Sequence, residues 1–207
     1  MAVETDEQQA EQIKIFWNAH KIKIISGFVV LLIIFFTQYF YRQYNLKNSE
    51  EASQLYQEIL IEKVENFNTI EESVALLKRD YNSTPYAARA AIYFSKILVD
   101  QASNNAAIEE LIWAGSNSPE KSIKSMSYFY LSNLYLAEKK LDKAMDAANK
   151  IITKGYVGLV NDLKGDIYKA MGNKKSAKEF YQKALNYFQG RGEFYKVIQN
   201  KKDALGQ

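Results

Sequence analysis

Three pairs of adjacent glutamates are the residues of this 207-residue sequence that come closest to a catalytic arrangement: Glu50 and Glu51, Glu71 and Glu72, Glu109 and Glu110. Paired carboxyl groups act as acid and base in glycoside hydrolysis, where both must face one bond. Neighbouring positions on a helix point about 100° apart, so these side chains do not converge. We expect the second and third pairs to lie near helix starts, where the helix dipole favours negative charge.

Other kinds of catalytic site lack their side chains. The sequence has no cysteine and one histidine, His20, and a single imidazole without thiolates cannot build a zinc site. Glycine-rich phosphate loops, the G-x-G-x-x-G fingerprint and the H-E-x-x-H motif do not occur. The 15 tyrosines indicate aromatic packing rather than a radical relay. We therefore expect a protein that is not an enzyme, with no catalytic residues, no metal and no cofactor.

An uncharged stretch near the N-terminus, residues 24–41, indicates a membrane span. At a helical rise of about 1.5 Å per residue it reaches roughly 27 Å, enough for the hydrocarbon core of a bilayer. A cleavable signal peptide is the alternative, but aromatic and basic residues follow at 39–44 instead of the small residues of a cleavage site. A core helix that is apolar on every side would need a larger protein around it. We therefore predict a short tail over 1–22 and a transmembrane signal-anchor helix over 23–42.

The basic residues around this span favour an N-terminus in the cytoplasm, because Lys and Arg accumulate on the cytoplasmic side of membranes. Three lysines precede the span and two basic residues follow it within reach: Lys14, Lys21 and Lys23, then Arg42 and Lys47. Membrane lipid is then a partner of the single span. The lack of cysteine is compatible with an oxidising or a reducing compartment.

The remaining residues, 43–207, are numerous enough for one domain with its own core. The chain has 47% hydrophobic and 25% charged residues and a net charge of +3, as a folded protein does. Its C-terminal end is basic, because residues 164–207 hold 10 Lys and Arg against 4 Asp and Glu. This end is either a solvated helical face or a patch for an acidic partner or anionic lipid headgroups. Nucleic acid is disfavoured as a partner, since the lysines are scattered and a membrane span precedes them.

Apolar residues after the span recur at spacings of three and four, which predicts an all-α domain. Pro85 and Pro119 follow clusters of Ser, Asn and Thr and mark loops before helix starts. One cluster, residues 82–84, fits a glycosylation sequon formally and is interpreted as a loop. Further helix breaks are predicted at residues 66–69, 103–105, 154–155 and 190–192.

Small and aromatic residues recur at the spacings of a tetratricopeptide repeat. Small residues let two antiparallel helices approach, aromatic residues fill the space between them, and Gly172 permits the turn. Shifts of 33 and then 37 residues reveal two earlier repeats, of which the first is degenerate. From the last repeat to the first, the residues are Gly165, Tyr168, Gly172, Ala177, Tyr181 and Ala184; Tyr128, Leu131, Ser132, Tyr135, Leu141 and Ala144; Ala91, Phe94, Ser95, Leu98, Ala107, Leu111 and Ala114.

The predicted fold is therefore an N-terminal transmembrane helix followed by a tetratricopeptide-like α-solenoid of antiparallel helix pairs. Residues 49–67 and 70–81 form a further pair without the signature, and residues 192–205 form a C-terminal capping helix. A solenoid needs such atypical ends, since each repeat is covered only by its neighbours. The alternative is a helical bundle, in which alanine and aromatic stripes also arise.

The first helix of each pair would line a concave surface that could bind a protein segment. Its middle is apolar and its rims are charged, which suits an amphipathic or unfolded segment. Alternatively, the C-terminal helix or the first helix pair folds into this surface and covers it. The candidate binding residues are Arg89, Ile92, Lys96, Val99, Met126, Phe129, Asn133, Leu136, Leu159, Asp162, Asp166 and Lys169.

The arrangement as a whole resembles the YfgM family, the ancillary subunits of the SecYEG translocon in Gram-negative bacteria. The resemblance covers nearly the whole chain and rests on the order and spacing of several segments. They are residues 12–17, the span with the aromatic residues after it, 53–59 (SQLYQEI), 86–100 (YAARAAIYFSKILVD) and 163–172 (LKGDIYKAMG).

This resemblance implies an inner-membrane protein with its repeat domain, residues 43–207, in the periplasm. It implies Sec translocon subunits and the periplasmic chaperone PpiD as partners, together with unfolded exported chains. The expected function is a membrane-tethered protein-interaction module that assists or scaffolds the chaperoning of exported proteins. The alternative is a structural adaptor in a cell-envelope or cell-division complex without chaperone activity. The basic C-terminal segment is not accounted for by the resemblance.

Overall fold

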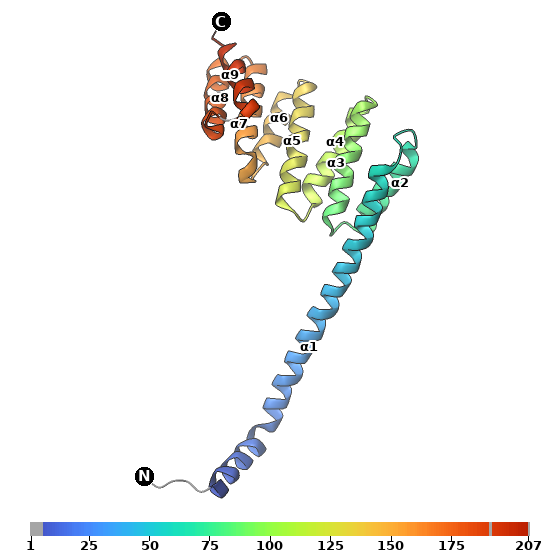
Figure 1. Cartoon of the computed structure of the whole chain (residues 1–207), viewed down its shortest axis with the longest axis vertical. Coiled ribbons are helices and arrows are strands. Elements are labelled where there is room, and N and C mark those ends of the chain that lie inside the picture. The colour runs from blue at the N-terminus through green and yellow to red at the C-terminus, as the bar shows by residue number, and fades with distance from the viewer. Residues whose placement is uncertain (1–5, 191, 207) are drawn as a thin grey trace. The chain divides into compact units, whose positions relative to one another are not determined.

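The computed structural model describes residues 6–190 and 192–206, and this part of the chain is helical without a strand (Figure 1). The all-α prediction is therefore confirmed. The α-helices are α1 (Asp6–Ile61), α2 (Phe67–Asp80), α3 (Pro85–Asp100), α4 (Asn104–Asn117), α5 (Lys121–Ala137), α6 (Leu141–Asn149), α7 (Val157–Ala170), α8 (Lys174–Phe188) and α9 (Gly192–Asp203), and a 3-10 helix, η1 (Lys154–Tyr156), precedes α7.

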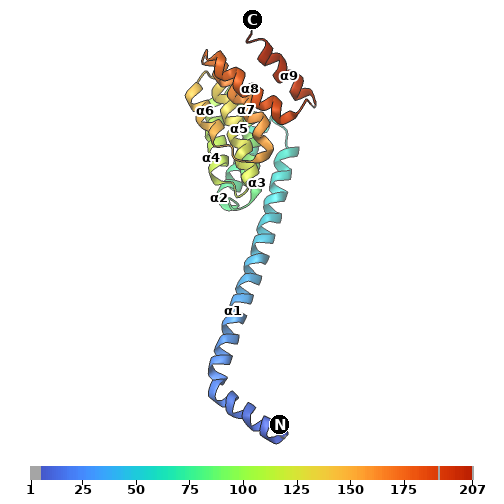
Figure 2. The ribbon, with the colours of Figure 1, turned by 90° about the vertical axis from the view of Figure 1, so that its left-hand side faces the viewer.

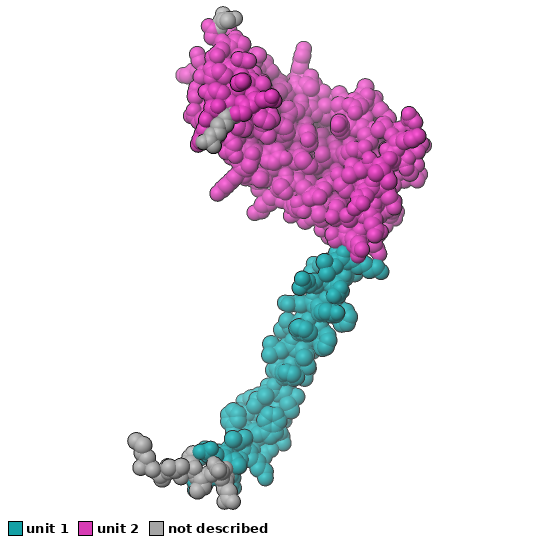
Figure 3. All heavy atoms as spheres, in the orientation of Figure 1, with its two compact units in different colours: residues 1–47 teal, residues 48–207 magenta. Residues whose placement is uncertain are grey.

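The chain divides into two compact units, residues 1–47 and residues 48–207 (Figure 3). In the first unit, the side chains described from residue 8 to residue 44 are all exposed. Its most apolar window has a mean hydropathy of 2.1 and buries nothing inside the protein. A helix that is apolar on every side needs apolar surroundings. By length and composition α1 can therefore cross a membrane, in agreement with the predicted span.

The second unit consists of helix pairs that follow one another in chain order (Figures 1 and 2). α3 packs on α4, α5 on α6 and α7 on α8, and the capping helix α9 packs on α8. The first helices of successive pairs also touch, α3 with α5 and α5 with α7. Because each helix contacts its neighbours in the sequence, the unit is an α-solenoid.

Small residues at the repeat positions allow the close packing of the last pair. Ala177 and Ala184 of α8 are fully buried, as is the ring of Tyr181. A Cβ atom on Gly165 of α7 would lie 2.4 Å from Cδ1 of Tyr181, so only glycine fits opposite this ring. The predicted roles of Gly165 and Tyr181 are confirmed.

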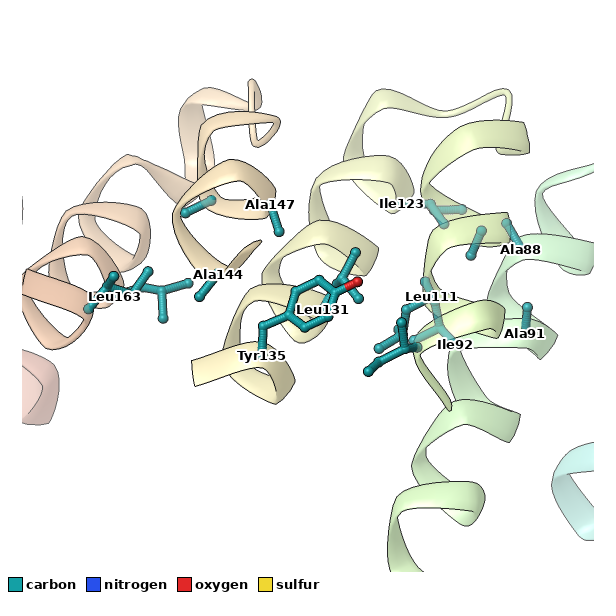
Figure 4. Close-up of a cluster of buried hydrophobic side chains, with 14 residues drawn as sticks. Ala88, Ala91, Ile92, Leu111, Ile123, Leu131, Tyr135, Ala144, Ala147 and Leu163 are labelled. Carbon is teal, nitrogen blue, oxygen red and sulfur yellow. The ribbon is translucent and has the colours of Figure 1, made fainter. Parts of the chain in front are cut away.

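The middle pair uses serine where the last pair uses glycine. Ser132 of α5 is fully buried, and its Oγ donates a hydrogen bond to the carbonyl oxygen of Ala144 in α6 at 2.7 Å. The hydroxyl therefore fits in the core because it has an acceptor. Figure 4 shows Leu131 and Tyr135 of the same helix between Leu111 on one side and Ala144 on the other.

The loop after α1 begins earlier than predicted. The sequence pattern placed a helix over 49–67 and a break at 66–69, but α1 ends at Ile61 and α2 begins at Phe67. Asn66 donates from Nδ2 to Oε1 of Glu62 at 2.6 Å, and such local side-chain bonds compete with the helix. Ile61 is 83% exposed, so no core contact holds a further helical turn.

Most of the other predicted breaks agree with the structure. Pro85 is the first residue of α3, and η1 occupies the break at 154–155. The break predicted at 103–105 falls at residues 101–103 instead, because α4 already begins at Asn104. Gly190 and Gly192 have positive φ angles of 75° and 79°, which glycine adopts without strain. Arg191, between them, lies outside the described residues, as do residues 1–5 of the predicted tail.

The expected position of two acidic pairs at helix starts is wrong. Neither α2 nor α4 has an acidic residue in its first turn, and the effect of the helix dipole fades beyond that turn. Glu110 instead accepts a hydrogen bond from Lys78 of α2 at 2.6 Å, and this lysine lies 5.1 Å from the ring centre of Trp113. These contacts join two neighbouring helix pairs.

Candidate protein-binding groove

An open groove with a volume of about 900 Å³ lies between the first helices of the first three pairs. Side chains from the end of α1, from α3, from α5 and from η1 line it, and α4 contributes Leu111 to its floor. Six of the residues predicted from the repeat register lie in this lining: Arg89, Ile92, Lys96, Val99, Met126 and Asn133. Two of the three helices whose residues were predicted, α3 and α5, therefore line the groove.

Two of the four residues predicted on α5, Phe129 and Leu136, do not line the groove. Phe129 and Leu136 are half-buried and pack against the core cluster, and the ring of Phe129 lies 6.0 Å from that of Tyr156. The residues that follow them in the chain, Tyr130 and Ala137, line the groove instead. Both faces have helical spacing, and the packing against α7 and η1 turns the aromatic side chain of Phe129 inward.

The predicted residues of α7 do not line this groove. Leu159 is half-buried and Lys169 is exposed elsewhere. Asp162 and Asp166 are bound by Lys201 of α9, whose Nζ donates to Asp162 at 2.9 Å and to Asp166 at 2.7 Å. The C-terminal helix thus covers the inner face of the last pair, which was one of the two alternatives, while the groove between the earlier pairs stays open.

Several lining residues were not identified from the sequence. Tyr56 belongs to the helix pair without a repeat signature, and Tyr156 lies in the 3-10 helix, where no periodic pattern applies. Tyr130 and Ala137 could have been found from the spacing of four residues after Met126 and Asn133. The remaining lining residues that were missed are Tyr93, Ser95, Leu111, Glu120, Ser122, Ile123 and Leu134.

The charged groups of the groove lie on α3 and at the start of α5. Arg89 is 3.5 Å from Glu120 and lies over the ring of Tyr86, with 5.6 Å between the guanidinium carbon and the ring centre. Lys96 is exposed and has no hydrogen-bond or ion-pair partner among the described residues. The groove therefore holds one paired cation and one cation that is available to a ligand.

Two tyrosines of the groove keep their hydroxyl protons over a wide pH range. Burial raises the pKa of Tyr56, and the nearby Arg89 opposes this in part. Burial also raises the pKa of Tyr156, with a smaller contribution from Tyr130. At neutral pH both phenols are therefore protonated and can donate hydrogen bonds.

The cluster that holds α9 is partly buried and charged. Burial raises the pKa of Asp162, although Lys201 opposes this. Burial disfavours the ammonium of Lys201, but its hydrogen bonds to Asp166 and Asp162 outweigh burial and raise its pKa. Tyr181 donates to Oδ1 of Asp166 at 2.7 Å and lies beneath the same ammonium. The cluster therefore needs Lys201 in its charged form.

Alkaline pH is expected to weaken the attachment of α9. At pH values below its ordinary pKa of 10.5, the Lys201 ammonium stabilises the folded state. This stabilisation is lost as the pH rises through the pKa of Lys201 in the folded state, which is raised. Burial and the bond to Asp166 raise the pKa of Tyr181, so the phenol stays neutral in this range. The difference in thermal stability between the wild type and Lys201→Met, followed by circular dichroism, should stay constant to about pH 9 and shrink above about pH 11. A difference that is the same at both ends of this range would contradict the expectation.

The chain belongs to the tetratricopeptide repeat-like domain family, whose profile matches residues 14–207. Within the part that the structure describes, no group of three or more His, Asp or Glu side chains could hold a metal ion.

Curated relatives extend this likeness over most of the chain. A protein of Aggregatibacter actinomycetemcomitans is 26% identical over 86% of this chain and 88% of its own length. A protein of Neisseria gonorrhoeae is 23% identical over 99% of this chain and its whole length, and one of Buchnera aphidicola is 22% identical over 81% and 87%. Each is named "Ancillary SecYEG translocon subunit". The resemblance inferred from the sequence is confirmed.

Proposed function

We propose that this protein is a non-enzymatic, membrane-tethered interaction module that acts beside the Sec translocon and helps exported chains. The observation that carries the proposal is the open groove between α1, α3 and α5, with an apolar floor and a polar rim. Such a surface suits a protein segment with apolar side chains. The names of the relatives support a role beside the translocon. The proposal includes the chaperone PpiD as a partner, as the resemblance to the YfgM family implies.

The span is part of this mechanism. A domain held at the membrane meets a translocon at a high effective concentration, so a low-affinity groove can be sufficient. In this proposal α1 places the N-terminus in the cytoplasm, since lysines precede the apolar stretch. The repeat domain then works in the periplasm, where exported chains emerge unfolded and expose apolar segments.

Crosslinking from the groove tests the proposal. A photoreactive amino acid placed at Val99, Met126 or Ala137, which line the groove, should capture translocon subunits or a stalled exported chain in membranes. The same amino acid at Ala75 or Lys178, which are exposed outside the lining, should capture far less.

Two other results of this experiment would count against the proposal. Equal capture from all five positions would mean that proximity alone, and no groove, explains the crosslinks. Capture of one folded envelope or division protein, without exported chain or translocon, would favour the structural adaptor. Mass spectrometry of the crosslinked bands separates these outcomes.

A further inference from the structure

The open groove is rich in hydrogen-bond donors. Lys96 contributes an ammonium without a partner among the described residues, and four tyrosines line the same cavity, whose hydroxyls make no hydrogen bond among the described residues. The raised pKa values of Tyr56 and Tyr156 keep these two phenols protonated at neutral pH, so both can donate. The four tyrosines are Tyr56, Tyr93, Tyr130 and Tyr156.

The carboxylate in the same lining is already in use. Glu120 is the carboxylate among the described lining residues, and it lies 3.5 Å from Arg89 and accepts from Ser122 at 3.4 Å. The amide of Asn133 donates to the carbonyl of Phe129 at 2.8 Å, which leaves one amide oxygen as an acceptor. The carboxylate of the lining is therefore already paired, whereas the ammonium of Lys96 is not, so a carboxylate ligand finds an unpaired opposite charge and an ammonium ligand does not.

The acidic residues of α7, the first helix of the next pair, are engaged within the domain. Asp162 and Asp166 of α7 are both bound by Lys201 of α9, so one of their two negative charges is offset. Without that lysine, the two carboxylates beyond the groove would repel a negatively charged segment more strongly. In the lining of the open groove, Arg89 and Lys96 outnumber Glu120, so this surface is positive as well as apolar.

Lys96 lies among apolar side chains of its own helix. Ile92 and Val99, one turn before and about one turn after it, share its face of α3, and Met126 lies across the groove on α5. A carboxylate that meets this ammonium would be flanked by apolar contacts on both sides. Opposite charges at such a position set partner choice more than affinity.

We infer that the groove selects apolar protein segments that carry an acidic side chain, with the carboxylate held by Lys96. The inference rests on the proposed function, since it names the chemistry of the segment that the groove binds. Positively charged segments of the same hydrophobicity are disfavoured, because their ammonium groups meet Lys96 and find no free carboxylate.

Two fluorescent amphipathic peptides that differ only in a central glutamate or lysine test this inference. Their binding to the full chain in neutral phosphatidylcholine nanodiscs is followed by fluorescence anisotropy, with empty nanodiscs as the blank. The glutamate peptide should bind about tenfold more tightly than the lysine peptide. Lys96→Glu should reverse this preference, and Lys178→Glu, the same charge change on an exposed lysine outside the groove, should leave it unchanged.

Filling the groove separates this inference from the proposed function. Ala137→Trp puts an indole into the cavity and should abolish binding of both peptides. If both peptides bind equally and Ala137→Trp abolishes this binding, the charge selection is overturned and the groove remains a binding site. If Lys178→Glu and Lys96→Glu both reverse the preference for the glutamate peptide, the charge selection by Lys96 is also overturned, because the net charge of the protein would then be the cause. If neither peptide binds, both the charge selection and the proposed function are overturned.

Discussion

Replacement of Gly165 by alanine is expected to destabilise the last helix pair by about 1–3 kcal/mol, and Gly165→Val by more. The added Cβ would lie 2.4 Å from Cδ1 and from Cε1 of Tyr181, well inside van der Waals contact. The ring cannot move aside easily, since it is fully buried and its hydroxyl is bound to Asp166 at 2.7 Å. Hydrogen exchange of the amides in α7 and α8 measures the loss locally, as is appropriate for a solenoid whose pairs can open separately.

Gly155→Ala is the matched control for this substitution. Gly155 lies in η1, and a Cβ atom there would meet no other atom within 4 Å. Its effect on the exchange free energy should stay within about 0.5 kcal/mol. Equal effects of the two alanines would mean that the approach of α7 to Tyr181 is looser than the structure shows.

Replacement of Lys201 by methionine is expected to detach α9 from α7. The methionine keeps most of the apolar stem but leaves Asp162 and Asp166 facing each other without a cation. The side chain of Lys201 is 28% exposed, so the lost charged hydrogen bonds should cost about 1–3 kcal/mol rather than the larger value of a fully buried pair. The expected result is faster hydrogen exchange in α9, with α3 to α6 unchanged.

Lys202→Met makes the same chemical change at the next residue. Lys202 donates to Gln182 on the exposed surface of α8, at 2.6 Å, and no carboxylate depends on it. Its substitution should alter the exchange of α9 by no more than about 0.5 kcal/mol. If both substitutions left α9 equally protected, apolar contacts such as those of Ile198 would be sufficient to hold the helix.

The repeat architecture could be predicted because it depends on residue size at fixed spacings. The close contacts of the last pair were predicted from its small residues, Gly165, Ala177 and Ala184. The equivalent position of the middle pair was predicted at Ser132. The sequence could not reveal that Ser132 also donates to the carbonyl of Ala144, because that bond depends on the exact approach of α6. The early end of α1 was missed because its cause is a local bond between Asn66 and Glu62.

The groove could be predicted only in part, because periodicity fixes the faces of a helix but not which face the neighbours leave open. On α3, Arg89 and Val99 were placed correctly. On α5, two adjacent registers are both apolar, and the choice between Phe129 and Tyr130 depends on the position of η1. The covering of α7 by α9 depends on an ion cluster between residues far apart in the sequence, which no local pattern contains.

The contacts between neighbouring helices have a consequence for the order in which the domain folds. Since α3 packs on α4 and α5 on α6, each pair can fold before the later pairs have formed. The groove of α1, α3 and α5 can then be complete before α9 packs on α8. Until α9 arrives, Asp162 and Asp166 lack the ammonium of Lys201.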